Sequence, residues 1–345
     1  MPQTPPPLDA NAIQVPSLYL RALMELTQEM GVDPLAWLQA ADITPQHLAL
    51  PTVALSTARY LAMVHSLMRH TEEPAIGLLL GRRLRMNTHG TLAFAVMNSG
   101  SLRQAIQLVE RFLPLRTNLI TVRFDESGAH ARLHFAPAAD LGNAELLILE
   151  TVMLAVRNVF DYLAPGTQTV QAVEFVAVAT PYQSLAQELF ACPVHYNAAT
   201  NVLCLNPQTL DTPLSAADAQ SLANAAAMCQ TELDAFTARE SLTARIQRSM
   251  LGASGALPSL QASARMLHMA PRTLHRRLED EGTSYRAIID QVRHRLALQY
   301  LKNSAFSLQE IAYRLGYTDQ ANFRRAFKRW EGIAPSALRV GALPT

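Results

Sequence analysis

The 345-residue sequence has few cysteines, few aromatic residues and a net charge of only +1. Its three cysteines, Cys192, Cys204 and Cys229, share no C-x-x-C spacing, so neither a structural zinc site nor a redox pair is indicated. The first residues do not read as a secretory signal, and the longest apolar stretch, Leu146–Val156, is interrupted by Glu150. Because a membrane span needs roughly 18 to 20 clean apolar residues, we expect a cytoplasmic protein that makes no use of a membrane.

Signatures of common enzymes are also missing. The segments "HGTLAF" and "GLLLG" lack both the Lys-Ser/Thr pair of a P-loop and the glycine pattern of a dinucleotide site. The order Cys192-Pro193-Val194-His195 differs from the Pro-Cys-His-Arg setting in which DNA-repair methyltransferases activate their nucleophile. His65 with His70, or His130 with His134, could suggest metal ligands, but scattered surface or core histidines are the alternative that we favour. We therefore predict a protein that is not an enzyme, with no catalytic residues, metal site or cofactor.

Charge is distributed unevenly along the chain. From Glu240 to the C-terminus, 16 Lys and Arg residues stand against 8 Asp and Glu residues, a net charge of +8. The residues before Glu240 contain 13 basic side chains (29 − 16) and 20 acidic side chains (28 − 8), which gives them a net charge of −7. A basic end on an acidic body favours attraction to nucleic-acid phosphates. Arginine dominates the basic part, and its planar guanidinium can bind both acceptors of a guanine edge.

The same helical pattern occurs twice in this basic part. In each copy, apolar residues recur every three or four positions on both sides of a short turn, and one arginine takes the same place in the second helix. The corresponding residues are Ala264, Leu267, Leu274, Arg276 and Leu278 in the first copy and Ala312, Leu315, Phe323, Arg325 and Phe327 in the second. Two short helices joined by a tight turn are typical of the helix-turn-helix. The alternative is a solvated basic face on a structural bundle.

Start and stop signals flank these helices. Ser and Asp side chains can cap helix N-termini, proline suits a first helical position, and glycine can leave a helix with positive φ. The residues in such positions are Ser259, Pro271 and Gly282 in the first copy, and Ser307, Glu310, Gly316 and Asp319 in the second. Ser307 and Glu310 together have the spacing of a capping box.

The runs "RTLHRRLEDEGTSYRAIIDQVRHRLALQYL" and "SLQEIAYRLGYTDQANFRRAFKRWEGIAPSALR" closely resemble the DNA-binding domain of AraC/XylS transcriptional regulators, over residues 245 to 340. The most specific matches are Ile311, Ala312, Leu315, Gly316, Tyr317, Phe323, Arg325, Phe327, Gly332 and Pro335. The resemblance implies an all-α C-terminal domain over residues 240–345. In it, a long helix, here Ser284–Leu301, joins two helix-turn-helix motifs whose recognition helices enter successive major grooves of double-stranded DNA.

The resemblance also implies which side chains contact DNA. These are Arg272, Thr273, His275 and Arg276 in the first recognition helix and Gln320, Ala321, Asn322, Arg324, Arg325 and Lys328 in the second. Lys328 and Arg329 lie off the groove-facing edge, which suits a phosphate contact or an internal ion pair. Two positions depart from the family pattern. Ala321 replaces a polar residue, and Ala270 replaces the serine that commonly caps the first recognition helix.

Residues 14–211 mix helical and strand patterns and predict an α+β domain of helices plus a small sheet. The patterns indicate helices over residues 18–30, 34–41, 57–68, 75–84, 143–163 and 182–190, two helices about Ser99 and Gly100, a hairpin over 119–135, and strands over 169–179 and 201–205. "PSLYLRALMELTQEMGVDP" and "ELLILETVML" resemble the arabinose-binding-like effector domain of one branch of the AraC family. Residues 1–13 are proline-rich and are expected to be a disordered lead-in.

That second resemblance implies a small-molecule effector without identifying it. A sugar site normally offers aromatic platforms, and aromatic residues make up only 6% of the chain. Residues that could instead line a partly apolar pocket are Met86, Phe94, Met97, Phe112 and Phe135. For each of them, plain core packing is the alternative.

Residues 212–239 are expected to form a linker helix between the two domains. Leu222, Ala226, Cys229, Leu233 and Phe236 are spaced four, three, four and three, as in a coiled-coil seam. The seam predicts a homodimer contact. The alternative is packing of this helix on its own domain.

These patterns together predict a sequence-specific DNA-binding regulator of transcription, controlled by a small-molecule effector bound to the N-terminal domain. The alternative is a ligand-independent regulator whose N-terminal domain serves dimerisation or protein interaction. RNA polymerase is a further candidate partner, and these residues are compatible with either activation or repression.

Overall fold

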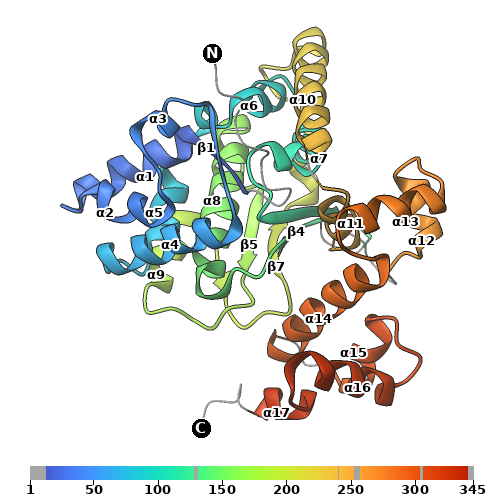
Figure 1. Cartoon of the computed structure of the whole chain (residues 1–345). Coiled ribbons are helices and arrows are strands. Elements are labelled where there is room, and N and C mark those ends of the chain that lie inside the picture. Colours follow the sequence, from blue (N-terminus) through green and yellow to red (C-terminus); the bar gives the residue numbers. More distant parts are fainter. Residues whose placement is uncertain (1–12, 128–130, 240, 252–256, 304–305, 341–345) are drawn as a thin grey trace, which may run out of the picture. The chain divides into compact units, whose positions relative to one another are not determined.

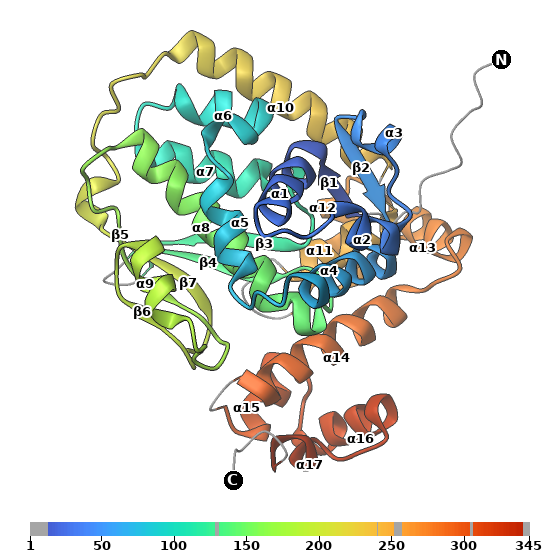
Figure 2. The ribbon, with the colours of Figure 1, turned by 90° about the vertical axis from the view of Figure 1, so that its left-hand side faces the viewer.

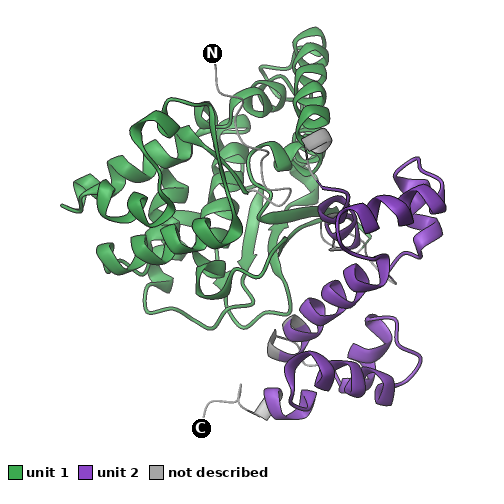
Figure 3. Cartoon of the chain, viewed as in Figure 1, with its two compact units in different colours: residues 1–239 green, residues 240–345 purple. Residues whose placement is uncertain are grey.

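The computed structural model describes residues 13–127, 131–239, 241–251, 257–303 and 306–340. The chain divides into two compact units, residues 1–239 and 240–345 (Figure 3). The expected lead-in, residues 1–13, lies outside the described residues except for Ile13, which begins the first strand. None of the helices in the described ranges combines the length and apolar character that crossing a membrane requires.

Unit 1 combines helices with two sheets, which confirms the expected α+β class (Figure 1). Its helices are α1 (Ser17–Glu29), α2 (Pro34–Leu38), α3 (Pro45–Leu48), α4 (Thr57–Thr71), α5 (Ile76–Arg83), α6 (Gly90–Met97), α7 (Leu102–Phe112), α8 (Glu145–Leu163), α9 (Gln183–Phe190) and α10 (Ala219–Arg239). Its 3₁₀ turns are η1 (Gln39–Ala41), η2 (Met86–Thr88), η3 (Leu113–Leu115), η4 (Gly142–Ala144) and η5 (Pro207–Thr209).

The main sheet of unit 1 has the strand order β3-β4-β7-β5-β6. These strands are β3 (Ile120–Asp125), β4 (Ala131–Pro137), β5 (Val170–Glu174), β6 (Val194–His195) and β7 (Asn201–Leu205). All neighbours pair antiparallel except β5 and β6, which are parallel. The expected hairpin is β3 and β4. Alternate residues of β4, Ala131, Leu133 and Phe135, are buried, so the alternation in the sequence marks the covered face of the sheet.

A second, two-stranded sheet was not indicated by the sequence patterns. It pairs β1 (Ile13–Pro16) with β2 (Thr52–Leu55) in antiparallel register. Each strand has only four residues, too few to show a clear period of two, and the partners lie far apart in the sequence.

The strand expected over residues 169–179 is shorter in the structure. It ends as β5 at Glu174, where main-chain pairing with β7 stops. The N–H of Val176 donates instead to the side chain of Asn201 at 2.9 Å. Val178 is consequently exposed rather than packed in the sheet.

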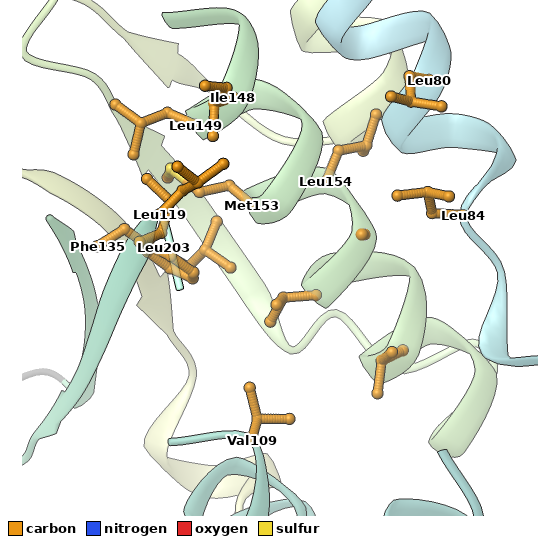
Figure 4. Packing of buried hydrophobic residues seen from close by; sticks show 14 of the residues in the cluster. Leu80, Leu84, Val109, Leu119, Phe135, Ile148, Leu149, Met153, Leu154 and Leu203 are labelled. Carbon is orange, nitrogen blue, oxygen red and sulfur yellow. The ribbon is translucent and has the colours of Figure 1, made fainter. Parts of the chain in front are cut away.

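Helix α8 lies at the centre of the unit 1 core, between the main sheet and α5. Figure 4 shows Met153 of α8 beside Phe135 of β4 and Leu203 of β7, while Leu154 points toward Leu80 of α5. The apolar residues on both sides of α8 account for its nearly continuous hydrophobic sequence, which a helix buried on several sides requires.

The segment "GLLLG" allows α5 to approach α8 closely. A Cβ at Gly77 would lie 2.5 Å from the carbonyl oxygen of Leu147, and one at Gly81 would lie 3.0 Å from that of Thr151. At this separation the Thr151 hydroxyl donates to the Gly77 carbonyl at 2.9 Å and the Asn158 amide donates to the Gly81 carbonyl at 3.0 Å. These glycines therefore serve helix packing.

The expected linker helix is α10, and it belongs to unit 1. It runs beside α6 and also contacts α7 and η3 (Figure 2). Within its seam, Cys229 is fully buried, and Leu222 and Leu233 pack against the unit 1 core. These seam residues therefore pack within their own domain. This packing corresponds to the alternative given above to a homodimer contact.

The described part of unit 2 is helical throughout, which confirms the all-α class expected for residues 240–345. Its helices are α11 (Leu242–Leu251), α12 (Leu260–Met266), α13 (Pro271–Asp280), α14 (Tyr285–Asn303), α15 (Leu308–Arg314), α16 (Gln320–Glu331) and α17 (Pro335–Val340). The pairs α12–α13 and α15–α16 are the two helix-turn-helix motifs. The expected connecting helix, Ser284–Leu301, is α14.

Helix α14 takes part in both hydrophobic cores of unit 2. Ile288 and Val292 lie in the core of the first motif, whereas Ala297 and Leu301 lie in the core of the second. Leu296 packs against both. One continuous helix therefore fixes the rotation and spacing of one motif relative to the other.

Glu150 of α8 is fully buried in the core of unit 1. Burial raises the pKa of its carboxyl to about 8. Its Oε2 accepts a long hydrogen bond, 3.4 Å, from the Tyr182 hydroxyl, while its Oε1 has no partner. The carboxyl is therefore held largely protonated at neutral pH.

We predict that Glu150→Gln removes a pH dependence of stability. Because the folded pKa lies above the unfolded value, the folded state binds more protons. The wild-type free energy of unfolding therefore falls as pH rises from about 4 to about 8, by at most about 1.4 kcal/mol per pH unit. Glu150→Gln keeps the shape without the ionisation and should be the more stable protein at about pH 9. Urea denaturation across this range tests the prediction, with exposed Glu188→Gln as control. The prediction would be contradicted if the free energy of unfolding changed with pH equally in the wild type and in Glu150→Gln.

Candidate nucleic-acid interface

The first recognition helix, α13, begins at Pro271, whose fixed φ suits a first helical position. Ala270 provides no side-chain cap, as expected from its lack of a polar group. Leu274 and Leu278 are buried in the core of the first motif. This leaves the opposite face of α13 to polar residues.

On that face, Arg272, His275 and Arg276 are exposed, and Thr273 is half-buried. The imidazole Nδ1 of His275 lies 3.3 Å from a carboxylate oxygen of Glu279, one turn further along. Both side chains of this pair are more than half exposed, so the pair contributes little stability, and the imidazole can exchange this partner for another at little cost.

The second recognition helix, α16, has stronger start signals. The Asp319 carboxylate accepts from the backbone N–H of Asn322 at 2.7 Å, so the predicted cap is confirmed. The preceding helix, α15, starts with the predicted capping box: Ser307 accepts from the Glu310 N–H at 3.2 Å, and Glu310 accepts from the Ser307 N–H at 2.7 Å. Phe323 and Phe327 are fully buried and hold α16 against α14 and α15.

The outward face of α16 carries most of the predicted contact residues. Exposed side chains are Ala321, Arg324, Arg325 and Lys328, and half-buried ones are Gln320 and Asn322. Arg276 and Arg325, the arginines at equivalent places in the two copies, are thus both exposed. Exposure of both is a requirement for any role in reading bases.

A hydrogen-bond chain orients Arg325. The Asn322 amide donates to the Asp319 carboxylate at 2.6 Å, and the Asn322 carbonyl oxygen accepts from the Arg325 guanidinium at 2.8 Å. Asn322 therefore belongs to the helix cap as well as to the outward face. The sequence indicates Asp319 as a cap, but only the folded helix brings the Asn322 and Arg325 side chains together.

Both recognition helices border one groove of about 790 Å³. His275 of α13, Asn322 and Arg325 of α16, and Arg286 and Arg293 of α14 line it. The groove therefore connects part of the polar face of α13 with part of the polar face of α16. The charged side chains that border it are the arginines Arg286, Arg293, Arg325 and Arg329 and one acidic residue, Asp290, and this excess of positive charge suits a polyanion.

Contacts from α14 fix the position of the second motif. The Arg293 guanidinium donates to the Leu315 carbonyl at 2.9 Å and lies over the Tyr317 ring, 4.7 Å from its centroid. On α16, Arg329 forms an ion pair with Asp290 of α14 at 3.0 Å. From the sequence, Arg329 was expected to make either a phosphate contact or an internal ion pair. The structure places it in an ion pair.

The first motif is anchored by a different set of contacts. The Tyr285 hydroxyl of α14 lies 2.7 Å from the Ser263 hydroxyl and donates to the Pro258 carbonyl at 2.7 Å. The Glu281 carboxylate accepts from the N–H groups of Leu242 and Thr243 at the start of α11. These polar contacts surround the core formed by α11, α12, α13 and α14.

The two turns have the same backbone shape but different residues. Gly316 has φ +76° in the second motif, and His268, 48 positions earlier, has φ +52° in the first. The hydrogen bonds also correspond: the Met269 N–H donates to the Ala264 carbonyl at 2.8 Å, and the Tyr317 N–H donates to the Ala312 carbonyl at 2.9 Å. The left-handed conformation of His268 could have been found by aligning the two copies across the turn.

Unit 1 contains a cavity of about 120 Å³. Its walls are mostly aliphatic and come from β1, α1, α4, α5, α7 and α8. Of the predicted pocket residues, Met86 lines this cavity. Phe112 and Phe135 are buried in the core away from it, Met97 packs partly buried against the core, and Phe94 is half exposed. For Phe112 and Phe135 the structure therefore matches the core-packing alternative.

The cysteines offer no reactive thiolate. Burial raises the pKa of both Cys192 and Cys204 to about 11, so these thiols stay protonated at neutral pH. Cys229 is buried, and burial raises its pKa as well. In the part of the chain that the structure describes, no cluster of three His, Cys, Asp or Glu side chains is arranged to hold a metal ion.

Unit 2, with two helix-turn-helix motifs on one connecting helix and a basic outward face, defines a DNA-binding protein of the double helix-turn-helix class. Comparison with known protein families agrees. Residues 31–214 match the family described as the arabinose-binding domain of AraC transcription regulator, N-terminal, and residues 263–340 match a helix-turn-helix domain family. The chain belongs to the AraC family of transcriptional regulators and is a DNA-binding regulator of transcription.

Individual relatives are similar over the whole chain. The "Ornithine utilization regulator" of Pseudomonas aeruginosa is 32% identical, covering 96% of this chain and 98% of the relative. An uncharacterised HTH-type transcriptional regulator of Mycobacterium tuberculosis is 28% identical, covering 97% and 98%. A crystal structure of the transcriptional regulator CdpR from Pseudomonas aeruginosa covers 94% of this chain and 98% of that chain, with 24% identity and a TM-score of 0.47. The two relatives from the sequence comparison are regulators of transcription or of metabolic utilisation by name.

We predict opposite effects of exchanging the residues at the two equivalent turn positions. His268→Gly should stabilise unit 2 by about 1 kcal/mol, because glycine adopts positive φ without a Cβ clash. Gly316→Ala should destabilise it by about 1 kcal/mol for the same reason. Denaturation followed by Trp330 fluorescence, in a Trp37→Phe background, measures both. A destabilised His268→Gly would show that the imidazole makes a compensating contact.

Proposed function

We propose that α13 and α16 enter successive major grooves on one side of operator DNA. The observation that carries this proposal is the equivalent placement of Arg276 and Arg325. Both are exposed, each lies at the same position of its motif, and α14 joins the two motifs through their cores. A helix fits the major groove of B-form DNA, where every base pair presents a distinct pattern of donors and acceptors.

The base contacts follow from the chemistry of each side chain. Arg272, Arg276 and Arg325 can each bind guanine O6 and N7, and Gln320 can bind adenine in the same bidentate way. Ala321 offers no hydrogen bond but can contact a thymine methyl group. The remaining members of the proposed interface are Thr273, His275, Asn322 and Arg324.

We assign Asn322 a positioning role. In the free protein its amide is bound to the Asp319 carboxylate and its carbonyl oxygen to Arg325. This arrangement points the Arg325 guanidinium before DNA arrives, which reduces the entropy lost on binding.

Phosphate contacts are assigned to side chains outside the base-reading set. Lys328 is exposed near the C-terminus of α16 and can neutralise a phosphate. The net charge of +8 on residues 240–345 supports a large electrostatic share of the affinity and a strong salt dependence.

A small-molecule effector is the proposed input to unit 1. The match of residues 31–214 to a ligand-binding domain family and the cavity between its helices support this proposal. An effector alters DNA binding only if it favours one arrangement of the protein over another. The second candidate, a ligand-independent regulator whose unit 1 serves dimerisation or protein interaction, predicts no such response.

Homodimerisation and contact with RNA polymerase complete the proposal. A dimer would place two copies of unit 2 on repeated half-sites and raise occupancy through effective concentration. Because the predicted seam of α10 packs on α6, the proposed dimer contact must use another surface or require α10 to move. Light scattering at micromolar protein concentration tests whether a stable dimer exists. A DNA-binding function also supports a cytoplasmic site of action.

We predict that Arg276→Ala and Arg325→Ala each reduce specific DNA affinity by about 1 to 3 kcal/mol and relax base preference at one position. Lys328→Ala should weaken binding to all sequences alike and lower the salt dependence. Selection from a random DNA library by the wild type supplies the operator, and gel-shift titration on operator and scrambled DNA measures each variant. Equal losses on both DNAs for Arg276→Ala would remove its base-reading role.

A further inference from the structure

One end of the unit 1 cavity is polar. The Tyr19 hydroxyl lies 2.7 Å from His89 Nδ1, and His89 is only 9% exposed. Burial, together with the nearby charge of Arg116, lowers the pKa of His89 to about 4, against a smaller opposing effect of the Leu84 carbonyl. The ring is therefore neutral. When the phenol donates to Nδ1, the ring proton lies on Nε2, which makes no hydrogen bond of normal geometry, although the Leu84 carbonyl lies near the ring.

Arg116 adds a positive charge at the same end. Its side chain is 17% exposed, and its Nε has no partner. The guanidinium lies against the first turn of α6, since a Cβ on Gly90 would be only 2.6 Å from Nη1. Helix α6 starts without a side-chain cap. The cation and the positive end of the helix both favour an anion at this place, and the Glu232 carboxylate of α10 meets part of that need.

The rest of the cavity is largely apolar, and its other polar lining residues are Gln14, Tyr60, Thr117 and Thr151. Side chains such as Leu23, Met63 and Val156 form its walls, and the described residues that line it include no Asp or Glu. An ammonium group would therefore find no counter-charge there. The ligand that suits these walls is apolar and carries negative charge at one end only.

We propose that this cavity binds a small amphipathic monocarboxylate. Its carboxylate is held by Arg116, His89 Nε2 and the first N–H groups of α6, which no side chain caps, and its apolar body lies among the aliphatic walls. The volume of about 120 Å³ resembles engineered cavities of ~150 Å³ that accept benzene, which indicates ligands of the size of hexanoate or benzoate. This inference rests on the proposed effector control and specifies the chemical class of the effector.

The contacts of Arg116 also connect the cavity to α10. A terminal nitrogen of Arg116 lies 3.7 Å from a carboxylate oxygen of Glu232, and the Thr91 hydroxyl donates to the same Glu232 oxygen at 2.9 Å. A ligand carboxylate competes with Glu232 for Arg116 and weakens this link between α10 and the start of α6. Helix α10 directly precedes residue 240 in the chain, where unit 2 begins.

Calorimetric titration of the full-length protein tests the site. The probes are hexanoate and benzoate, their neutral counterparts hexanamide and benzamide, and ornithine. We expect the carboxylates to bind at least about tenfold more tightly than the amides, because a buried charge-assisted pair is lost, and we expect no binding of ornithine. Equal affinity for acids and amides, or binding of ornithine alone, would overturn the proposal.

Three variants assign the contact. Arg116→Met should reduce carboxylate affinity by about tenfold or more, while Tyr60→Phe, a change elsewhere on the cavity wall, should leave it within about twofold. Glu232→Gln removes the competing carboxylate and should tighten binding several-fold. This gain keeps the test decisive even if Arg116→Met fails to fold. Unchanged affinity in Glu232→Gln would refute the competition, and unchanged affinity in folded Arg116→Met would refute the site.

Gel-shift titration with and without hexanoate separates this inference from the proposed function. If hexanoate changes operator affinity in the wild type but not in Arg116→Met, the result supports both the carboxylate site and effector control of DNA binding. Carboxylate binding without any effect on DNA affinity supports the site and contradicts effector control. Absence of binding by all probes at millimolar concentration overturns the site, while operator binding itself remains a separate result.

Discussion

The DNA-binding unit depends on the burial of one helix in two cores. Ile288 and Val292 of α14 pack in the first motif, and Ala297 and Leu301 pack in the second. Because close-packed interiors resist small displacements, the two motifs move as one body within this unit. The ion pair of Arg329 with Asp290 and the hydrogen bonds of Arg293 then set the position of α16. The proposed recognition by the exposed arginines depends on this apolar scaffold, because it fixes their spacing.

Unit 1 shows a different use of close packing. Glycines in α5 bring it against α8, which covers the sheet on its other side. The packing is incomplete at one place, and there polar groups without partners face an aliphatic cavity. Unsatisfied buried donors cost free energy, so their persistence next to a cavity points to a ligand as the missing partner. The contact between Arg116 and Glu232 joins this place to α10, the helix that leads toward the DNA-binding unit in the sequence.

Much of the interface was predictable because its signals are local. Ser307 with Glu310, Asp319, Pro271 and Gly316 act within a few residues of their own position, so their roles could be inferred from spacing and confirmed. The two-stranded sheet of β1 and β2 was missed because its strands are short and distant in sequence. The end of β5 was missed because a tertiary contact, Val176 with Asn201, ends the strand where hydrophobic alternation continues.

The sequence alone determined the class of both units, the doubling of the helix-turn-helix motif and the outward placement of Arg276 and Arg325, since periodicity and charge encode which face of a helix is buried. Only the tertiary structure decided which residues meet across long separations. In the structure the residues of the apparent dimer seam of α10 pack within unit 1, where α10 lies against α6. Phe112 and Phe135 lie in the core instead of lining the cavity. The tertiary structure also brought His89, Arg116 and Glu232 together. Such contacts depend on how elements pack against one another, and a one-dimensional pattern does not contain that information.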